Sequence, residues 1–259
     1  MPNAEGLGAV LRDRLPFLRW SALRFVLGGP SLLRTGQVGD GREQALLEHV
    51  LATVTAGDTD GVITAIDDFA RRRSLLMNVG DEKGALLDAA VRRAEPAVLL
   101  ELGTYCGYSA IRIGRAMPER ARLVSIETSP ANAEIARAII EYAGLTDRVS
   151  VLVGKIGDDG RTLRTLAIEH DFGPGTVDFV FIDHWKNAYL PDLKTILAAG
   201  WLHPGSIVVA DNVKMPGAPG YRRFMHEREG RSWRTVEHKT HVEYQSLLPD
   251  LVLESEYLG

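Results

Sequence analysis

Cysteine is nearly absent from this sequence of 259 residues, which has a single one, Cys106. One thiol cannot form an intrachain disulfide, so the composition suits a reducing compartment. Cys106 lies in a glycine-rich turn, and no histidine is close to it in the sequence. We therefore predict that this thiol packs in the core and is not a nucleophile.

An excess of basic residues is also missing, because 30 lysines and arginines stand against 34 aspartates and glutamates, a formal net charge of −4. Nucleic-acid-binding proteins need a clustered basic surface. We therefore expect no nucleic-acid partner and a small molecule as the substrate.

The sequence has no apolar run that is continuous enough to span a bilayer. Its most apolar stretch, residues 15–33, is interrupted by Arg19, Arg24 and a Gly-Gly-Pro break, and it shows no clear cleavage site. Apolar residues at positions 17, 20, 23 and 27 predict an amphipathic helix. Three roles are open to it: packing on the rest of the chain, which we favour, a dimer contact, or contact with a membrane surface. We expect a cytoplasmic protein, with peripheral membrane contact through residues 15–33 left open.

Strands and helices alternate over most of the chain. Residues 36–41 are polar and glycine-rich, and we interpret them as the linker that closes an N-terminal extension (1–41) before one domain (42–259). Two amphipathic helices are expected over 46–54 and 62–70. The expected strands are 98–101, 123–127, 149–153, 179–183 and 207–211, and helices begin near residues 107, 130, 158, 188 and 218. This order predicts an α/β fold, a Rossmann-like doubly wound, mostly parallel sheet with helices on both faces. Residues 233–236 and 251–253 add an antiparallel hairpin at the C-terminal edge.

The turn after the first strand lacks the third glycine of a dinucleotide fingerprint and the Gly-Lys-Ser/Thr of a P-loop. Its sequence, ELGTYCGYS, places Glu101 at the strand end and Gly103 and Gly107 in the turn. These glycines permit a positive φ or the close approach of a ligand. The next strand ends in Glu127, where doubly wound folds bind a ribose diol. The pattern favours a nucleoside without a phosphate, S-adenosylmethionine; an ordinary turn of another α/β protein is the alternative.

Two further strands end in acidic residues, so four carboxylates meet at one edge of the sheet: Glu101, Glu127, Asp183 and Asp211. They would repel one another unless a cation lies among them. Asp183, Asp211 and Asn212 offer hard oxygen ligands, which suit Mg²⁺. A turn or helix cap is the alternative interpretation of the Asp211-Asn212 pair.

Lys186 follows Asp183 by three residues. A lysine beside a divalent cation releases its proton more readily, because like charges repel, and it can then accept a proton from a hydroxyl. The alternative is an exposed surface lysine. The adjacent His184 leaves the strand end in a different direction, so we expect it to line the nucleoside site and not to bind the metal.

Five motifs of this sequence closely resemble those of catechol O-methyltransferases, the class I, Mg²⁺-dependent and S-adenosylmethionine-dependent family. They occur in the family's order and at its approximate spacing, from about residue 42 to the C-terminus. The motifs are MNVGDEKG (77–84), LLELGTYCGYSAIR (99–112), SIE (125–127), FIDHWKNAYLPD (181–192) and VVADNVKMPGAPG (208–220).

The resemblance implies a complete set of site residues. The metal ligands would be Asp183, Asp211 and Asn212, and the catalytic residues Lys186, as general base, and Glu243, which would bond the second catechol hydroxyl. S-adenosylmethionine would contact Met77, Val79, Glu101, Gly103, Tyr105, Ser109, Glu127, Asp183, His184 and Trp185. The substrate would contact Leu75, Met77, Trp185, Lys186, Asn212, Pro216 and Glu243.

The sequence departs from the family pattern at three places. Leu75 replaces a tryptophan that usually closes over the flat substrate, so we expect a wider mouth. Ile156 and Gly157 replace a Ser-Gln pair beside the adenine, so those hydrogen bonds are lost or replaced. About five extra residues lie within 160–175.

The resemblance and the residues together predict transfer of a methyl group from S-adenosylmethionine to one hydroxyl of a catechol-type vicinal diol, with Mg²⁺ as cofactor. Two alternatives stay open. The acceptor could be a larger phenolic or another bacterial diol metabolite, which the replacement at Leu75 favours. The chain could also be a non-catalytic nucleoside-binding protein, in which the metal and base residues would coincide by chance.

Overall fold

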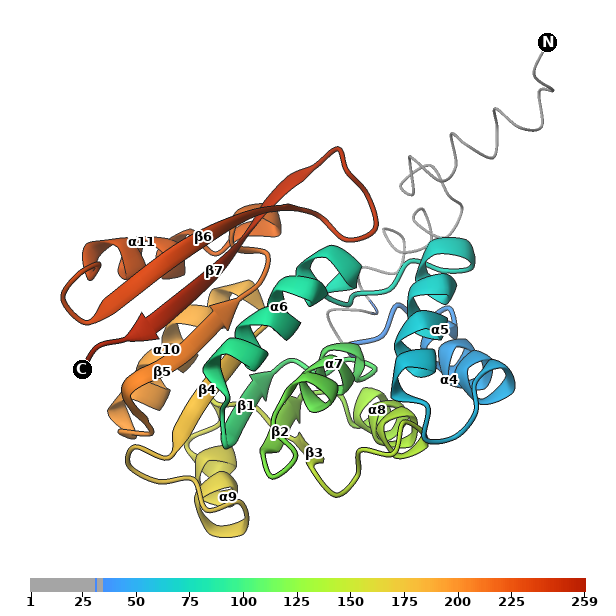
Figure 1. Cartoon of the computed structure of the whole chain (residues 1–259), viewed down its shortest axis with the longest axis horizontal. Coiled ribbons are helices and arrows are strands. Elements are labelled where there is room, and N and C mark those ends of the chain that lie inside the picture. The colour runs from blue at the N-terminus through green and yellow to red at the C-terminus, as the bar shows by residue number, and fades with distance from the viewer. Residues whose placement is uncertain (1–30, 32–34) are drawn as a thin grey trace.

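A computed structural model describes residue 31 and residues 35–259, and its centre is a seven-stranded sheet (Figure 1). The amphipathic helix predicted over residues 15–33 lies outside the described residues except for Ser31. The strand order is β3-β2-β1-β4-β5-β7-β6, and only the pairs that involve β7 are antiparallel. The strands are β1 (Val98–Leu102), β2 (Arg122–Glu127), β3 (Val149–Val153), β4 (Val177–Ile182), β5 (Leu202–Ala210), β6 (Trp233–His241) and β7 (Pro249–Tyr257). The predicted fold class is confirmed.

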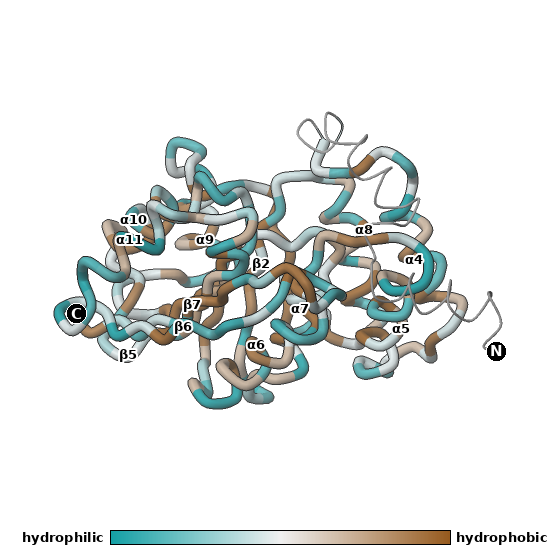
Figure 2. Tube along the Cα trace, turned by 90° about the horizontal axis from the view of Figure 1, so that it is seen from above, coloured by the Kyte–Doolittle hydropathy of each residue, from teal (hydrophilic) through white to brown (hydrophobic). Residues whose placement is uncertain are grey.

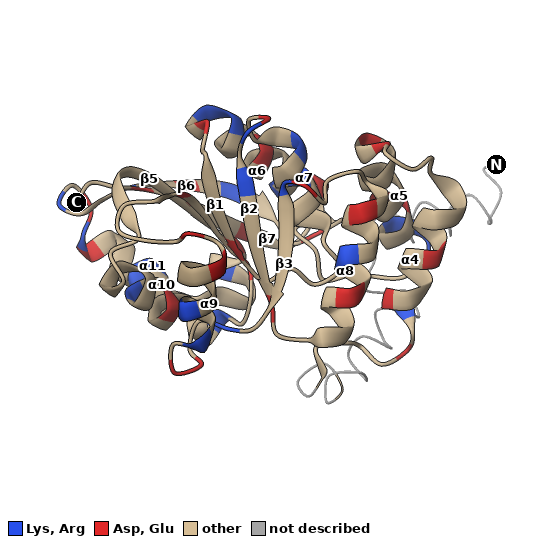
Figure 3. Ribbon diagram, turned by 90° about the horizontal axis from the view of Figure 1, so that it is seen from below, with Lys and Arg blue, Asp and Glu red and all other residues tan. Residues whose placement is uncertain are grey.

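Helices cover both faces of the sheet (Figure 3). Helices α6, α7 and α8 pack on one face, with α4 and α5 outside them, and α9, α10 and α11 pack on the other. The helices are α4 (Arg42–Thr53), α5 (Thr59–Arg72), α6 (Gly80–Ala94), α7 (Tyr108–Ala116), α8 (Pro130–Tyr142), α9 (Arg161–Glu169), α10 (Tyr189–Ala198) and α11 (Pro219–Glu227), and short turns are formed by η2 (Lys186–Ala188) and η3 (Val213–Gly217). Among residues 31 and 35–259, none of the helices has the length and apolar character needed to cross a bilayer.

The central strands are buried on both faces, which explains their nearly continuous apolar sequence. In β1, Leu99 packs in the core under α6–α8 and Leu100 in the core over α9–α11. Figure 2 shows hydrophobic residues concentrated through the middle of the molecule and hydrophilic ones along its outer loops. Cys106 is buried in the first of these cores, as expected for a packing residue.

The C-terminal hairpin is longer than the sequence pattern indicated, because β6 and β7 each have nine residues. The middle of β6 is rich in polar residues, including Glu237, His238 and Lys239, and this hides the apolar alternation by which strands are recognised. The consequence for the site is that the loop of residues 242–248 and the start of β7 lie at the carboxyl end of β5.

The strand order reverses between β1 and β4, and ligands bind at such a switch point in open α/β sheets. The turn after β1 crosses directly over the end of β4. Gly103 has a φ of +103°, and a Cβ atom at this residue would lie 2.3 Å from the backbone oxygen of Asp183. Only glycine therefore permits the turn to approach β4 so closely.

Candidate active site

The ends of β4 and β5 bring together the three residues that the sequence assigned to a metal. The Lys186 ammonium donates to Oδ1 of Asp183 at 2.9 Å and to Oδ1 of Asn212 at 3.2 Å. One cationic group thus contacts oxygens of both residues, which shows that they can share a cation.

Asp211 adds a buried carboxylate to this pair. Its side chain is fully buried, and burial raises its pKa above the usual range. Oδ1 accepts the backbone N–H of Asn212, whereas Oδ2 has no hydrogen-bond partner among the residues that the structure describes. A buried, unpartnered carboxylate oxygen is costly unless a cation or a proton neutralises it. The donor set of two carboxylates and one amide oxygen therefore fits Mg²⁺, which prefers such ligands.

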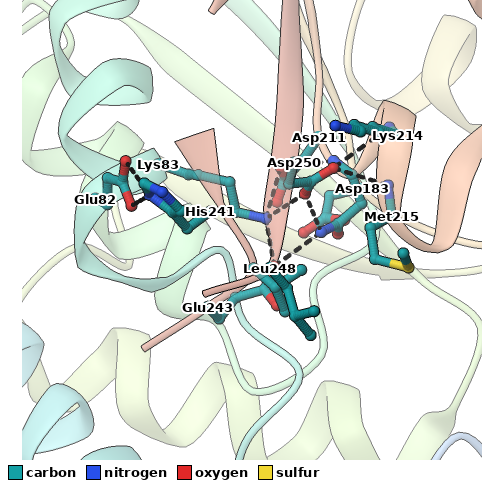
Figure 4. Close-up of polar contacts among 12 residues, drawn as sticks. Glu82, Lys83, Asp183, Asp211, Lys214, Met215, His241, Glu243, Leu248 and Asp250 are labelled. Carbon is teal, nitrogen blue, oxygen red and sulfur yellow. Dashed lines mark hydrogen bonds and ion pairs between the residues drawn. The ribbon is translucent and has the colours of Figure 1, made fainter. Parts of the chain in front are cut away.

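A buried lysine that the sequence analysis missed lies on the other side of Asp211 (Figure 4). Lys83 is 1% exposed, and its ammonium contacts Asp211 at 2.9 Å, Asp250 at 3.2 Å and Glu243. Burial alone lowers the pKa of Lys83, but Asp211, Glu243 and Asp183 outweigh this effect and raise it. Lys83 is therefore one positive charge that relieves the repulsion expected at this edge of the sheet.

The sequence of α6 did contain one indication that Lys83 is buried beside an acidic partner. Lys83, Leu87 and Val91 are four residues apart and all lie on the buried face of α6. A charged residue at a position that belongs to the apolar face indicates a buried partner. The partner Asp250 is 167 residues away, so no local pattern could identify it.

Lys186 is held by a second group that was not predicted, the phenol of Tyr189. Its hydroxyl accepts a hydrogen bond from Lys186 Nζ at 2.5 Å and donates one to the backbone oxygen of Asp211 at 3.0 Å. Complete burial raises the pKa of Tyr189 well above its usual value, so it stays a neutral phenol. Tyr189 thus holds the Lys186 ammonium in place between the ends of β4 and β5.

The end of β1 carries a second buried acid with an unsatisfied oxygen. Glu101 is fully buried, and this burial raises its pKa to about 7, although hydrogen bonds from Ser109 and Ser125 oppose the shift. Oε1 of Glu101 has no partner within residues 31 and 35–259. The arrangement suits a positively charged group at the switch point.

Glu127 ends β2 and accepts backbone N–H groups of Tyr105 and Ser129, each at 2.8 Å. Tyr105 has a positive φ of 49°, which turns its N–H toward this carboxylate. The Tyr105 hydroxyl donates to Glu43 of α4 at 2.9 Å. Glu127 is thus fixed in place and keeps lone pairs on both oxygens for a ligand.

His184 and Trp185, which follow Asp183, have different environments. Nε2 of His184 lies 2.8 Å from Asp192 of α10, and the imidazole stacks on Tyr189 with ring centroids 5.2 Å apart. Trp185 is 62% exposed. Ile156 is buried and Gly157 exposed, and neither residue has a side chain that forms hydrogen bonds.

Glu243 belongs to the loop between β6 and β7 and reaches the same edge of the sheet. Its Oε1 accepts from Asn212 Nδ2 at 2.9 Å and from Lys83. The loop is anchored by Tyr244, whose hydroxyl donates to Asp67 at 2.9 Å and accepts from Asn78 Nδ2 at 2.8 Å. These bonds connect the Glu243 loop to α5 and to the segment that precedes α6.

The loops around this edge carry exposed apolar side chains. Trp185 follows β4, Met215 follows β5, and Leu247 and Leu248 belong to the same loop as Glu243; all four are more than two-fifths exposed. The other predicted substrate and cofactor contacts are the half-buried Leu75 and Met77, the buried Val79 and the exposed Pro216. Apolar surface at the rim of a polar site suits the body of an apolar or aromatic ligand.

Residues 51–219 match the model of the O-methyltransferase family. The chain is 63% identical to a probable O-methyltransferase of Mycobacterium tuberculosis over 229 residues, which cover 88% of this chain and 97% of that protein. It is 44% identical to catechol O-methyltransferase B of Danio rerio over 218 residues, which cover 84% and 80% of the two chains. Among solved structures, an O-methyltransferase from Bacillus cereus in complex with SAH superposes with a TM-score of 0.59 and 26% identity, covering 82% of this chain and 90% of that one.

Proposed function

The chain belongs to the O-methyltransferase family, and we propose that it transfers a methyl group from S-adenosylmethionine to one hydroxyl of a catechol-type diol with the help of Mg²⁺. The observation that carries the proposal is the shared cation position at the ends of β4 and β5. There, oxygens of Asp183 and Asn212 contact one ammonium, and Asp211 keeps a buried, unpartnered oxygen.

Asp183, Asp211 and Asn212 would hold Mg²⁺. The bound cation would supply Lewis acidity, which lowers the pKa of a substrate hydroxyl and orients the diol. Lys186 lies beside these ligands, where its amine can take the proton of the hydroxyl that becomes methylated. Glu243 lies close to Asn212 and would accept a hydrogen bond from the second hydroxyl.

The switch point supports S-adenosylmethionine as the methyl donor. Glu101 would pair with the ammonium of its methionine part, because this buried carboxylate keeps one oxygen without a described partner. Glu127 would bind the ribose hydroxyls, and His184 and Trp185 would flank the adenine. Binding in this place would bring the sulfonium methyl toward the substrate hydroxyl beside Lys186, and holding donor and acceptor together in this way would supply much of the rate.

A larger acceptor is the second candidate, and exposed apolar side chains favour it. Leu75 offers less aromatic surface than a tryptophan, and the apolar residues Trp185, Met215 and Leu247 are exposed on the loops that follow β4, β5 and β6. A catechol that carries a bulky apolar substituent would bury this surface, whereas a simple catechol leaves much of it in water.

The proposal is tested by measuring methyl transfer from S-adenosylmethionine to dihydroxybenzoate and to a catechol with a bulky apolar ester. Each reaction is run with Mg²⁺, with EDTA, and with EDTA followed by excess Mg²⁺. We expect activity that EDTA abolishes and Mg²⁺ restores. Activity that resists EDTA would contradict the metal assignment, and turnover of the ester alone would identify the larger acceptor as the substrate class.

A further inference from the structure

Asp250 is a buried carboxylate of β7 that lies behind the proposed metal ligands, and the activity proposed above gives it no role. Both of its oxygens are used. Oδ2 accepts from Asn212 Nδ2 at 2.8 Å and pairs with the Lys83 ammonium at 3.2 Å. Oδ1 accepts the backbone N–H groups of Met215 at 2.9 Å and Lys214 at 3.3 Å.

The contact to Asn212 determines which way its side-chain amide points. An asparagine side chain has one acceptor oxygen and one NH₂ donor. Its NH₂ group donates to both Asp250 and Glu243, so the oxygen is turned the other way, toward Lys186 and Asp183. A flipped amide would bring its oxygen against two carboxylates and would present NH₂ to the cation.

We propose that Asp250 is a positioning residue, which keeps the oxygen of Asn212 directed at the divalent cation. The same carboxylate holds the η3 turn through the N–H groups of Lys214 and Met215, next to the predicted substrate wall at Pro216. This inference rests on the proposed function, since it needs a divalent cation at Asn212. Residues that orient a metal ligand in this way typically change metal affinity ten- to a hundredfold when they are removed.

Lys83 explains why Asp250 orients a ligand and is not one itself. Oxygens of Asp211, Glu243 and Asp250 lie within 4.8 Å of one another, a spacing that could hold a metal ion. The Lys83 ammonium contacts all three of them, so this position already contains a cation that belongs to the chain. Asp250 is neutralised there and remains an acceptor for Asn212.

The first experiment measures the affinity of the full-length protein for Mn²⁺, as a probe of the Mg²⁺ site, by isothermal titration. We expect Asp250→Ala to weaken Mn²⁺ binding at least tenfold while the affinity for S-adenosylmethionine changes less than twofold. Asp178→Asn is the matched control. Asp178 also accepts two backbone N–H groups, from Ala97 and Val98, but at the opposite end of the sheet, so this variant should bind Mn²⁺ as the wild type does.

A second pair of variants separates orientation from general damage. Asn212→Asp supplies two equivalent oxygens, so it needs no orienting partner, and its carboxylate repels Asp250. Asp250→Ala should therefore strengthen Mn²⁺ binding in the Asn212→Asp background, although it weakens binding in the wild type. A loss of similar size in both backgrounds would overturn the proposal, because a merely structural role predicts that result.

Asp250→Asn provides the test if the alanine variant does not fold. An asparagine can accept on one side only, so it cannot satisfy both Asn212 and the η3 turn, and we expect at least a fivefold loss of Mn²⁺ affinity. If Asp250→Asn or Asp250→Ala binds Mn²⁺ with wild-type affinity, the role of Asp250 is overturned and the proposed function is not affected. Absence of Mn²⁺ binding by the wild-type protein would overturn the proposed function, and the inference with it.

Discussion

Lys186 is the residue whose removal most directly tests the chemistry. Its ammonium is held by Asp183, Asn212 and Tyr189, so alanine would remove the proposed proton acceptor without disturbing the sheet. We predict that Lys186→Ala lowers kcat by about 10²- to 10⁴-fold, the usual contribution of general acid–base catalysis. Equilibrium binding of S-adenosylmethionine, measured by titration calorimetry, should stay within twofold of the wild type.

Lys194→Ala is the control for this variant, because Lys194 lies exposed on α10, close in sequence to Lys186 but outside the site. It should keep the kcat of the wild type. If Lys186→Ala loses donor affinity and kcat to the same extent, the residue has a structural role and is not the general base.

We predict that the affinity for S-adenosylmethionine depends on pH through the ionisation of Glu101. Burial raises its pKa from 4.5 to about 7, so between these values the folded protein keeps a proton that the unfolded chain has lost. Proton linkage then requires the contribution of Glu101 to stability to fall as the pH rises through this window. Only the ionised form can pair with the ammonium of S-adenosylmethionine. Its dissociation constant should therefore increase about tenfold per pH unit below 7 and level off just above it, before the α-amino group of the donor loses its own proton at about pH 8.

The measurement is a series of calorimetric titrations between about pH 5.5 and 7.5, where the donor keeps its ammonium, with the wild type and with Glu101→Gln. The glutamine variant cannot ionise, so its affinity should be weaker and nearly independent of pH. An unchanged pH profile in Glu101→Gln would assign the titration to another group.

At the level of elements, the turn between β1 and α7 depends on its close approach to β4. A Cβ atom at Gly103 would meet the Asp183 backbone oxygen at 2.3 Å, and this oxygen cannot move without shifting the proposed metal ligand. We predict that Gly103→Ala lowers the free energy of unfolding by about 3 kcal/mol or more, from a positive φ and from steric overlap. Urea unfolding at constant pH measures the change.

Gly200→Ala isolates the cost of the backbone angle alone. Gly200 also has a positive φ, +69°, but nothing lies within 4 Å of the position of its Cβ. This variant should lose about 1–2 kcal/mol, the usual cost of a left-handed conformation. Equal losses in the two variants would show that the contact with β4 has no energetic importance.

Across the whole molecule, the proposed ligands would bind where the two halves of the sheet meet, so they should stabilise the complete fold. A ligand at one hundred times its dissociation constant adds about 2.7 kcal/mol to stability. For a domain of this size each kcal/mol corresponds to about 2–4 °C in Tm. We therefore expect S-adenosylmethionine to raise Tm by roughly 5–10 °C at that ratio.

Calorimetric scans with adenosine alone, with S-adenosylmethionine, and with S-adenosylmethionine plus Mg²⁺ test this expectation. Adenosine lacks the ammonium that would pair with Glu101, so it should stabilise the fold less at the same concentration. A Tm that does not respond to saturating S-adenosylmethionine would contradict the assignment of the switch point as its site.

The sequence by itself determined the order of strands and helices and the acids at the strand ends. Both depend on local patterns, namely apolar runs that end in a carboxylate and a turn. Asp183, Asp211 and Asn212 could therefore be assigned together from these patterns alone, since parallel strands end at the same edge of the sheet. Glu243 was assigned to the same site only through the resemblance to catechol O-methyltransferases, because no local pattern connects it with these three residues.

Only the tertiary structure decided how the charges at this edge are balanced. Lys83 and Asp250 are 167 residues apart, and neither shows a partner in its own segment. They meet because α6 packs on the sheet and β7 inserts beside β5, which places an ammonium among three carboxylates. Long-range packing, and not local propensity, determines which buried charges become neighbours, so the group that orients Asn212 could be recognised only in the folded chain.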